Sequence, residues 1–305
     1  MLPTRRYSFA VLLVAALLAG SARADDPAPA QTDHKAEIQA AWKAAQAKQT
    51  LGPAKVKLLD EATLELKAGE GFIPAAETVR VMRALGNQAD DDVTTGLVYG
   101  TKEDDSWLVV IEHTQEGYVR DGDAKEWQPD ALLENLKQGT EEGNKDRVER
   151  GYPELEIVGW VQPPKYDSAT HRLVWSLQDR SKGSDPGEPN GINYNTYALG
   201  RDGYFSLDLL TNTEDIDHDR PAVLDLLDNI TYLPGKRYED FNDSTDKVAE
   251  YGLAALIGAV AVKKLGLLAV IGVFLLKAWK LAAIAVVAVG ATIRRFFRRG
   301  DSATK

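Results

Sequence analysis

The chain has 305 residues, enough for one large domain or two small ones, and its 44% hydrophobic residues can build a core, which excludes a disordered chain. Residues 25–250 carry 45 acidic and 24 basic residues, whereas residues 251–305 carry 1 and 9. The acidic portion argues against a nucleic-acid partner. The absence of cysteine excludes disulfides, a thiol nucleophile and a thiolate metal site.

The first residues have the pattern of an export signal. Arg5 and Arg6 precede an apolar run over residues 9–19, and Ala22-Arg23-Ala24 places small residues where signal peptidase reads them. The run is about half the roughly twenty residues that a bilayer span needs, so an uncleaved anchor is the weaker alternative. We therefore expect residues 1–24 to be a signal peptide, cleaved after Ala24.

The chain from residue 25 to residue 232 alternates helical and strand patterns. Residues 25–50 read as a flexible leader with a short helix from Asp33 to Lys48. Further helices are predicted from Pro74 to Gly86, from Pro129 to Arg150, and onward from Pro221. Strands are predicted at residues 55–59, 62–67, 96–101, 106–113, 155–161, 173–177, 192–199 and 204–210.

Short turns between successive strands indicate an antiparallel sheet. One such turn is predicted at residues 163–168, where two prolines occur in sequence. The mixture of helices with such a sheet predicts a single α+β domain over residues 51–232. The element order is similar to that of the photosystem extrinsic protein and Mog1-like fold, an analogy that licenses no function.

The last fifty residues predict a membrane anchor. Residues 252–299 form apolar blocks closed by a basic stop, preceded by a juxtamembrane connector at 233–251 and followed by a tail at 300–305. The residues assigned to membrane anchoring are Lys277, Trp279, Lys280, Arg294 and Arg295. The positive-inside rule favours a single crossing, with the acidic domain in the periplasm and a short cytoplasmic C-terminus at a bacterial inner membrane. A hairpin is the alternative, although it would return four arginines to the periplasm.

Several short segments carry a resemblance to a known family. They are Gly117-Tyr118-Val119, Asp130-Ala131-Leu132-Leu133 with Gly139-Thr140 and Asn144, Val158-Gly159-Trp160, Pro164-Lys165-Tyr166-Asp167, Leu173-Val174-Trp175, Asn193-Tyr194-Asn195, Leu199-Gly200-Arg201-Asp202-Gly203, Tyr238-Glu239-Asp240-Phe241 and residues 246–252. From Gly52 onward the chain resembles a bacterial family of predicted membrane-anchored proteins with a domain of unknown function, number 2167. The resemblance implies an exported domain with a C-terminal anchor, and it brings no activity, cofactor or catalytic residue.

No catalytic, cofactor or metal site is predicted. The densest polar cluster, Glu214 to Asp219, lacks the glycine turn and terminal glutamate of a helix-loop-helix calcium site, so we interpret it as an exposed loop. The four histidines have no zinc-like spacing, and His113 is interpreted as a partly buried strand residue. Neither a nucleophile elbow nor a phosphate-binding glycine loop occurs.

Aromatic residues provide the strongest candidate for a ligand surface. Trp160, Tyr166, Tyr194 and Tyr197 lie on successive strands and the double-proline turn, so some could share one exposed face. Such a face would suit a peptide, a glycan or an envelope protein. The sequence therefore predicts a membrane-anchored periplasmic binding or scaffolding module. The alternative is a hydrolase of envelope polymers that uses dispersed aspartate and glutamate carboxylates.

Overall fold

The structure is a computed structural model that describes residues 31–257 except 88, 103, 104, 106, 126, 150 and 186. The predicted signal peptide and the membrane-anchoring residues Lys277, Trp279, Lys280, Arg294 and Arg295 lie outside the described residues. Over the described part of the chain, no helix is both long and apolar enough to cross a membrane.

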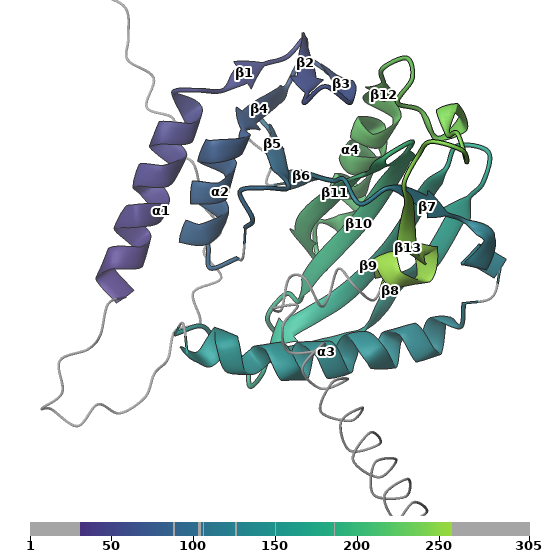
Figure 1. The fold of residues 1–305 in the computed structure, drawn as a ribbon. Coiled ribbons are helices and arrows are strands. Elements are labelled where there is room, and N and C mark those ends of the chain that lie inside the picture. Colours follow the sequence, from purple (N-terminus) through teal and green to yellow (C-terminus); the bar gives the residue numbers. More distant parts are fainter. Residues whose placement is uncertain are drawn as a thin grey trace, which may run out of the picture.

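The domain is built on an eight-stranded sheet in which every neighbouring pair is antiparallel (Figure 1). In spatial order its strands are β1 (Thr50–Leu51), β4 (Glu70–Pro74), β5 (Thr94–Gly100), β6 (Leu108–Thr114), β11 (Gly203–Asn212), β10 (Gly191–Gly200), β9 (Arg172–Ser181) and β8 (Leu155–Asp167). Successive residues of a strand point to opposite faces of the sheet, so each face has its own core.

One face is covered by α4 (Ile216–Asn229) and a small sheet of β2 (Ala54–Leu58), β3 (Ala62–Leu66) and β12 (Ile230–Tyr232). Leu64, Phe205 and Leu226 belong to the apolar core between these layers. The core residues of this face are almost fully buried.

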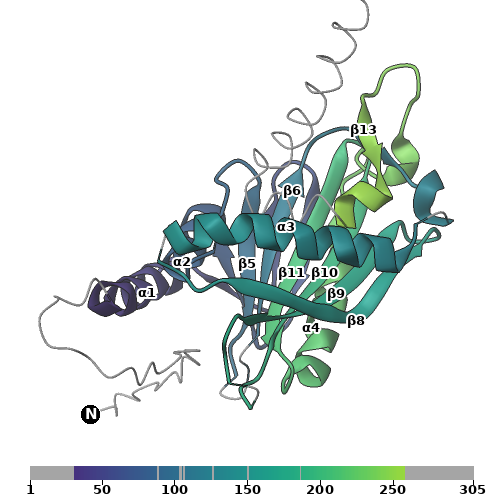
Figure 2. The same cartoon turned by 90° about the horizontal axis from the view of Figure 1, so that it is seen from below.

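The other face is covered by two separate groups of elements. Near β4, β5 and β6 it carries α1 (Gln31–Gln46) and α2 (Ala75–Ala84), whose Ala45 and Met82 share a core with Leu97. Near β8, β9 and β10 it carries α3 (Pro129–Glu149), whose Leu136 packs with Trp175. Figure 2 shows α3 lying across this face, with α1 and α2 beyond one of its ends.

The predicted α+β class with a large antiparallel sheet is confirmed by these strand pairings. The predicted turn at residues 163–168 is wrong, because β8 continues through both prolines to Asp167. Strand β8 is an edge strand with register shifts against β9, and an edge tolerates prolines that cannot donate to a ladder. The last helix also begins at Ile216 rather than at Pro221, so part of the expected acidic loop is helical.

The segment predicted as a connector, residues 233–251, packs on the domain. Its β13 (Val248–Gly252) pairs in parallel with β7 (Tyr118–Arg120). The short helix η2 (Tyr238–Asp240) lies between β12 and β13 in the sequence. Leu253 and Ile257 then enter the same core as Trp175 and are fully buried. The apolar spacing of residues 253–257 serves the domain core, so the described domain extends to residue 257.

Candidate functional site

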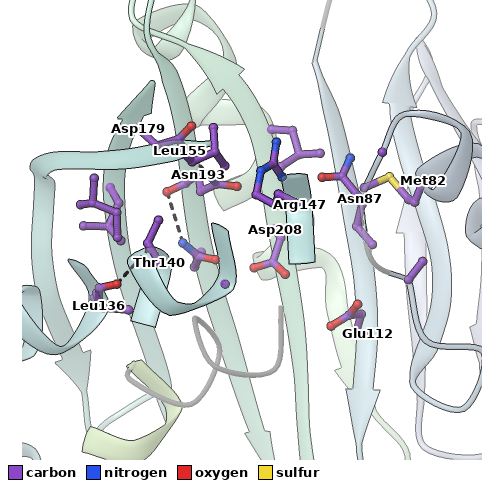
Figure 3. A pocket seen from close by; sticks show the side chains of 18 of the residues that line it. Met82, Asn87, Glu112, Leu136, Thr140, Arg147, Leu155, Asp179, Asn193 and Asp208 are labelled. Atoms are coloured by element: carbon purple, nitrogen blue, oxygen red, sulfur yellow. Dashed lines mark hydrogen bonds between the residues drawn. The ribbon is translucent and has the colours of Figure 1, made fainter. Parts of the chain in front are cut away.

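A cavity of about 180 Å³ lies where the two groups of covering elements leave the sheet face open. Met82 and Asn87 line it from the end of α2, and Thr140 and Arg147 from the second half of α3 (Figure 3). Its floor is the sheet itself. The floor residues come from five strands: Val110 and Glu112 of β6, Asp208 and Leu210 of β11, Asn193 and Asn195 of β10, Trp175, Leu177 and Asp179 of β9, and Leu155 and Ile157 of β8.

The polar floor residues come together through strand register. Asn195 lies directly opposite Asp208 on β11, and Asp208 lies opposite Val110 on β6. Glu112 lies two residues beyond Val110 on the same face, and Asn193 two residues before Asn195. Figure 3 shows Asp208 and Glu112 on the floor of the cavity, with Asn193 further along the sheet. Polar side chains thus occupy inward positions in the middle of a central sheet, which is the informative departure from an apolar core.

Helix α3 is fixed to the sheet beside the cavity by a buried asparagine. Asn144 donates its amide nitrogen to the Leu155 carbonyl at 2.8 Å and accepts from the Leu155 backbone N–H at 2.8 Å. Gly139 and Gly143 are also buried on this side of α3, so the helix backbone comes close to the sheet. These contacts fix the distance between α3 and the sheet beside the cavity.

The end of α2 is fixed against the segment that follows α3. Gly86 has φ +84°, and a Cβ at this position would come within 2.4 Å of the Tyr152 ring. Glycine is therefore required both for the left-handed helix end and for the close approach. The Arg147 guanidinium lies 5.9 Å from the centre of the same Tyr152 ring, and its Nε donates to the Pro153 carbonyl at 3.0 Å.

The fold displaces the titration of Asp179, a carboxyl group of the cavity lining. It is partly accessible but closely surrounded by protein, and its Oδ2 accepts a hydrogen bond of 2.7 Å from the Asn193 amide. Burial raises the pKa of Asp179, while the Asn193 hydrogen bond and the nearby Arg147 charge oppose the rise. The fold therefore holds a carboxylate in the cavity against a cost in solvation.

Two buried polar atoms lie on the cavity side of the sheet, one on the floor residue Trp175 and one on Tyr197. The Trp175 indole nitrogen is close to the Tyr197 hydroxyl, but neither atom has a hydrogen-bond partner of normal geometry. A buried polar group without a well-formed hydrogen bond costs about 1–3 kcal/mol. Native cores contain few such groups, and those that occur require an explanation.

The predicted aromatic surface does not exist as one face. Tyr194 and Tyr197 are 2% and 0% exposed, and they belong to cores on opposite sides of the sheet. Trp160 is half-buried against Trp175, and its indole N–H donates to the Pro129 carbonyl at 3.2 Å. Tyr194 and Tyr197 are three residues apart on one strand, which puts them on opposite faces.

Tyr166 is a partly buried strand residue, not an exposed turn residue. Its hydroxyl lies 2.9 Å from Asp121 Oδ2 and 3.1 Å from His171 Nδ1. The His171 ring stacks on Tyr238 at 4.1 Å. These contacts join the end of β8 to η2 of the C-terminal segment, so the polar end of Tyr166 serves internal packing.

The acidic cluster at residues 214–219 forms the start of α4. Asp219 is 1% exposed, and its carboxylate accepts from the Thr211 hydroxyl at 2.7 Å and contacts His218 Nδ1 at 2.9 Å. His113 is buried and packs against Phe205 at 4.6 Å. In the part of the chain that the structure describes, no group of three or more His, Asp or Glu side chains is arranged to hold a metal ion.

Residues 50–290 match the model of the family described as "Protein of unknown function (DUF2167)", and this match spans most of the chain. The protein therefore belongs to this family. A comparison with curated proteins found no match.

Two solved structures share a limited likeness with the chain. The solution structure of cyanobacterial PsbP (CyanoP) from Synechocystis sp. PCC 6803 is 8% identical, with a TM-score of 0.35 over 61% of this chain and 91% of that one. The Ran-binding protein Mog1p of Saccharomyces cerevisiae is 10% identical, with a TM-score of 0.30 over 60% of this chain and 96% of that one. At these TM-scores neither likeness carries an argument about this protein.

Proposed function

We propose that the protein is a binding module of the bacterial envelope, and that its binding site is the cavity between α2, α3 and the sheet. The observation that carries this proposal is the polar floor of Asn195, Asp208 and Glu112, placed on the inward side of central strands around a cavity of about 180 Å³. A sheet position covered by helices is normally apolar. Polar residues kept at such positions fit recognition of a ligand better than packing.

The direct test is to fill the cavity. Thr140 is 6% exposed and lines the cavity from α3, so Thr140→Leu places a larger apolar side chain within it. Ala131→Leu is the matched control, because Ala131 lies on an exposed part of the same helix. We expect thermal-shift screening with small-molecule fragments to detect ligands for the natural protein and for Ala131→Leu, but not for Thr140→Leu. If the fragments that bind the natural protein bind Thr140→Leu equally well, the cavity is not the site.

The location of this module is also proposed. The signal-peptide pattern of residues 1–24 and the apolar, basic-ended segment at 252–299 support an exported domain on a single inner-membrane crossing, with the domain in the periplasm. A reporter fused after Lys305 that is active only in the cytoplasm should then be active. Activity of a periplasm-specific reporter at that position would establish the hairpin instead.

One observation favours the alternative function, a hydrolase of envelope polymers. The raised pKa of Asp179, in a cavity that also contains Asp208 and Glu112, is a feature of acid–base sites. The small volume of about 180 Å³ supports a bound small molecule rather than a polymer strand. Incubation of the protein with isolated envelope polymers, followed by mass spectrometry of released fragments, separates the two functions: fragments lost in Asp179→Asn would establish the hydrolase.

The finer fold assignment is likewise a proposal. The succession of a central strand, a long helix, antiparallel strands and a closing helix supports the photosystem extrinsic protein and Mog1-like arrangement. An experimental structure of the domain would test this assignment, and a different strand order in the eight-stranded sheet would overturn it.

A further inference from the structure

We infer that the ligand of the cavity is a small protonated amine with an apolar body, an inference that rests on the proposed binding function. Three features of the cavity lead to this class of ligand: the charge of its lining, the hydrogen-bonding groups of its floor, and its size.

The charged side chains that line the cavity have an acidic excess. Glu112, Asp179 and Asp208 come from three different strands, whereas Arg147 is the basic residue of the lining. Arg147 donates to the Pro153 carbonyl and lies against the Tyr152 ring, so its position is set by the segment after α3. An ammonium group would be attracted to the acidic lining, whereas an anionic ligand would be repelled by it.

The amide groups of the floor add to the acceptor character. The Asn193 amide nitrogen donates to Asp179, and the Asn195 amide nitrogen donates to the Asn193 backbone carbonyl at 3.2 Å. Each bond uses one of the two N–H groups of its amide, and each amide also carries an oxygen acceptor. An ammonium group has three N–H donors and no acceptor, which matches a site composed of carboxylates and amide oxygens.

The size and the walls define the rest of the ligand. The apolar lining residues include Met82, Val110, Leu136, Ile157, Leu177 and Leu210. The volume of about 180 Å³ is close to that of an engineered cavity of roughly 150 Å³ that binds benzene. A ligand of one ring, or of a few methylene groups, with one charged end fits both the volume and the division between polar floor and apolar wall.

The experiment compares three molecules that share one ring and differ in charge: benzylamine, benzyl alcohol and benzoate. Binding to the full chain in detergent micelles at neutral pH is measured by calorimetric titration. We expect saturable binding of benzylamine, with benzyl alcohol about tenfold weaker or more, because a neutral hydroxyl forms weaker hydrogen bonds to carboxylates than an ammonium group does. Benzoate should show no binding.

Asp179→Asn should weaken benzylamine by about tenfold or more while leaving benzyl alcohol unchanged, because it removes one carboxylate and keeps the shape. Glu188→Gln is the matched control, since Glu188 is exposed and outside the cavity lining; this variant should bind like the natural protein. A contrary result is that benzyl alcohol or benzoate binds more strongly than benzylamine, with binding abolished by Thr140→Leu. That result would overturn the inference of an amine ligand and would still support the cavity as the binding site. No binding of any of the three, or binding that Thr140→Leu leaves unchanged, would overturn the cavity as the site and the inference with it.

Discussion

Asp179 and Asp246 are two aspartates whose pKa values the fold moves in opposite directions. Burial raises the pKa of Asp179. In contrast, the Arg201 guanidinium, which contacts Asp246 at 2.6 and 2.8 Å, lowers the pKa of that carboxyl far below its ordinary value, with help from the Asn242 backbone N–H. The first residue belongs to the candidate site, and the second fastens the C-terminal segment to the turn after β10. Their effects on stability therefore have opposite signs.

Replacement of Asp179 by asparagine should stabilise the domain at neutral pH. A carboxyl with a raised pKa in the folded state contributes its full stability below its unfolded pKa of about 3.9, and this contribution is lost as the pH rises through the folded pKa. Thermal melting from pH 3 to pH 8 should show Asp179→Asn melting above the natural protein near pH 7, with the gap closing towards pH 4 and below. Glu188→Gln should show no such gap. An Asp179→Asn variant less stable at every pH would contradict a solvation cost at this position.

Replacement of Asp246 by asparagine should have the reverse effect. A carboxyl with a lowered pKa contributes stability above its unfolded pKa of about 3.9, and the contribution is lost as the pH falls towards the folded pKa. Asp246→Asn should therefore melt below the natural protein at pH 7, and the difference should shrink as the pH falls below about 4. Asp243→Asn, whose carboxylate is mostly exposed beside Arg120, is the matched control and should change little. Equal melting of Asp246→Asn and the natural protein at pH 7 would contradict the assigned role.

At the scale of the elements, the C-terminal segment is part of the domain rather than a tether. Asp123 accepts hydrogen bonds of 3.0 Å from the backbone N–H groups of both Leu253 and Ala254, as a helix N-cap does. Leu253, Leu256 and Ile257 are at most 1% exposed. The chain therefore leaves the described domain from a fixed position, directly after residues that complete the core under α3.

A fragment of residues 31–250 should consequently be less stable than one of residues 31–257. Loss of three buried aliphatic side chains costs about 1.5–3 kcal/mol for each one. Urea unfolding of both fragments, in the presence and absence of a chelator, would measure the difference in the free energy of unfolding. The chelator should have no effect on either fragment, because the described residues contain no group of three or more His, Asp or Glu side chains arranged to hold a metal ion. Equal unfolding midpoints for the two fragments would contradict the role of residues 253–257.

Strong local patterns allowed most elements to be predicted. The hairpin of β10 and β11 and the helix α3 have clear alternation, turn glycines and helix-end signals. Strand β8 was not predicted at full length, because two prolines normally mark a turn and only its edge position makes them acceptable. Strand β13 was missed because its pairing with β7 depends on contacts between residues far apart in the sequence.

The candidate site was harder to predict than the fold. Asn193 and Asn195 alternate with apolar residues, which reads equally well as a solvated face of a strand. Only the position of α2 and α3 shows that this face is covered and that a cavity remains between them. The aromatic residues were predicted to form a ligand surface because their burial could not be predicted from the sequence. Two of them, Tyr194 and Tyr197, are buried in the structure.

At the scale of the whole molecule, the sheet has one face sealed by a continuous apolar core and one face covered in two parts. The helices on this face leave part of the central strands β6 and β11 uncovered between α2 and α3. The carboxylates Glu112 and Asp208 lie in this uncovered part. The architecture thus places a small acidic cavity at the meeting point of three structural units. Sites between packed units are a common position for ligand binding.

Nuclear magnetic resonance of the indole N–H signals tests this location most directly. In a fragment of residues 31–257 titrated with benzylamine, the Trp175 indole signal should shift in a saturable way, because Trp175 lines the cavity. The Trp42 signal should stay in place, since Trp42 packs beside Tyr99 and does not belong to the cavity lining. Trp175→Phe and Trp42→Phe variants assign the two signals. A saturable shift of Trp42 without one of Trp175 would contradict a binding site between α2, α3 and the sheet.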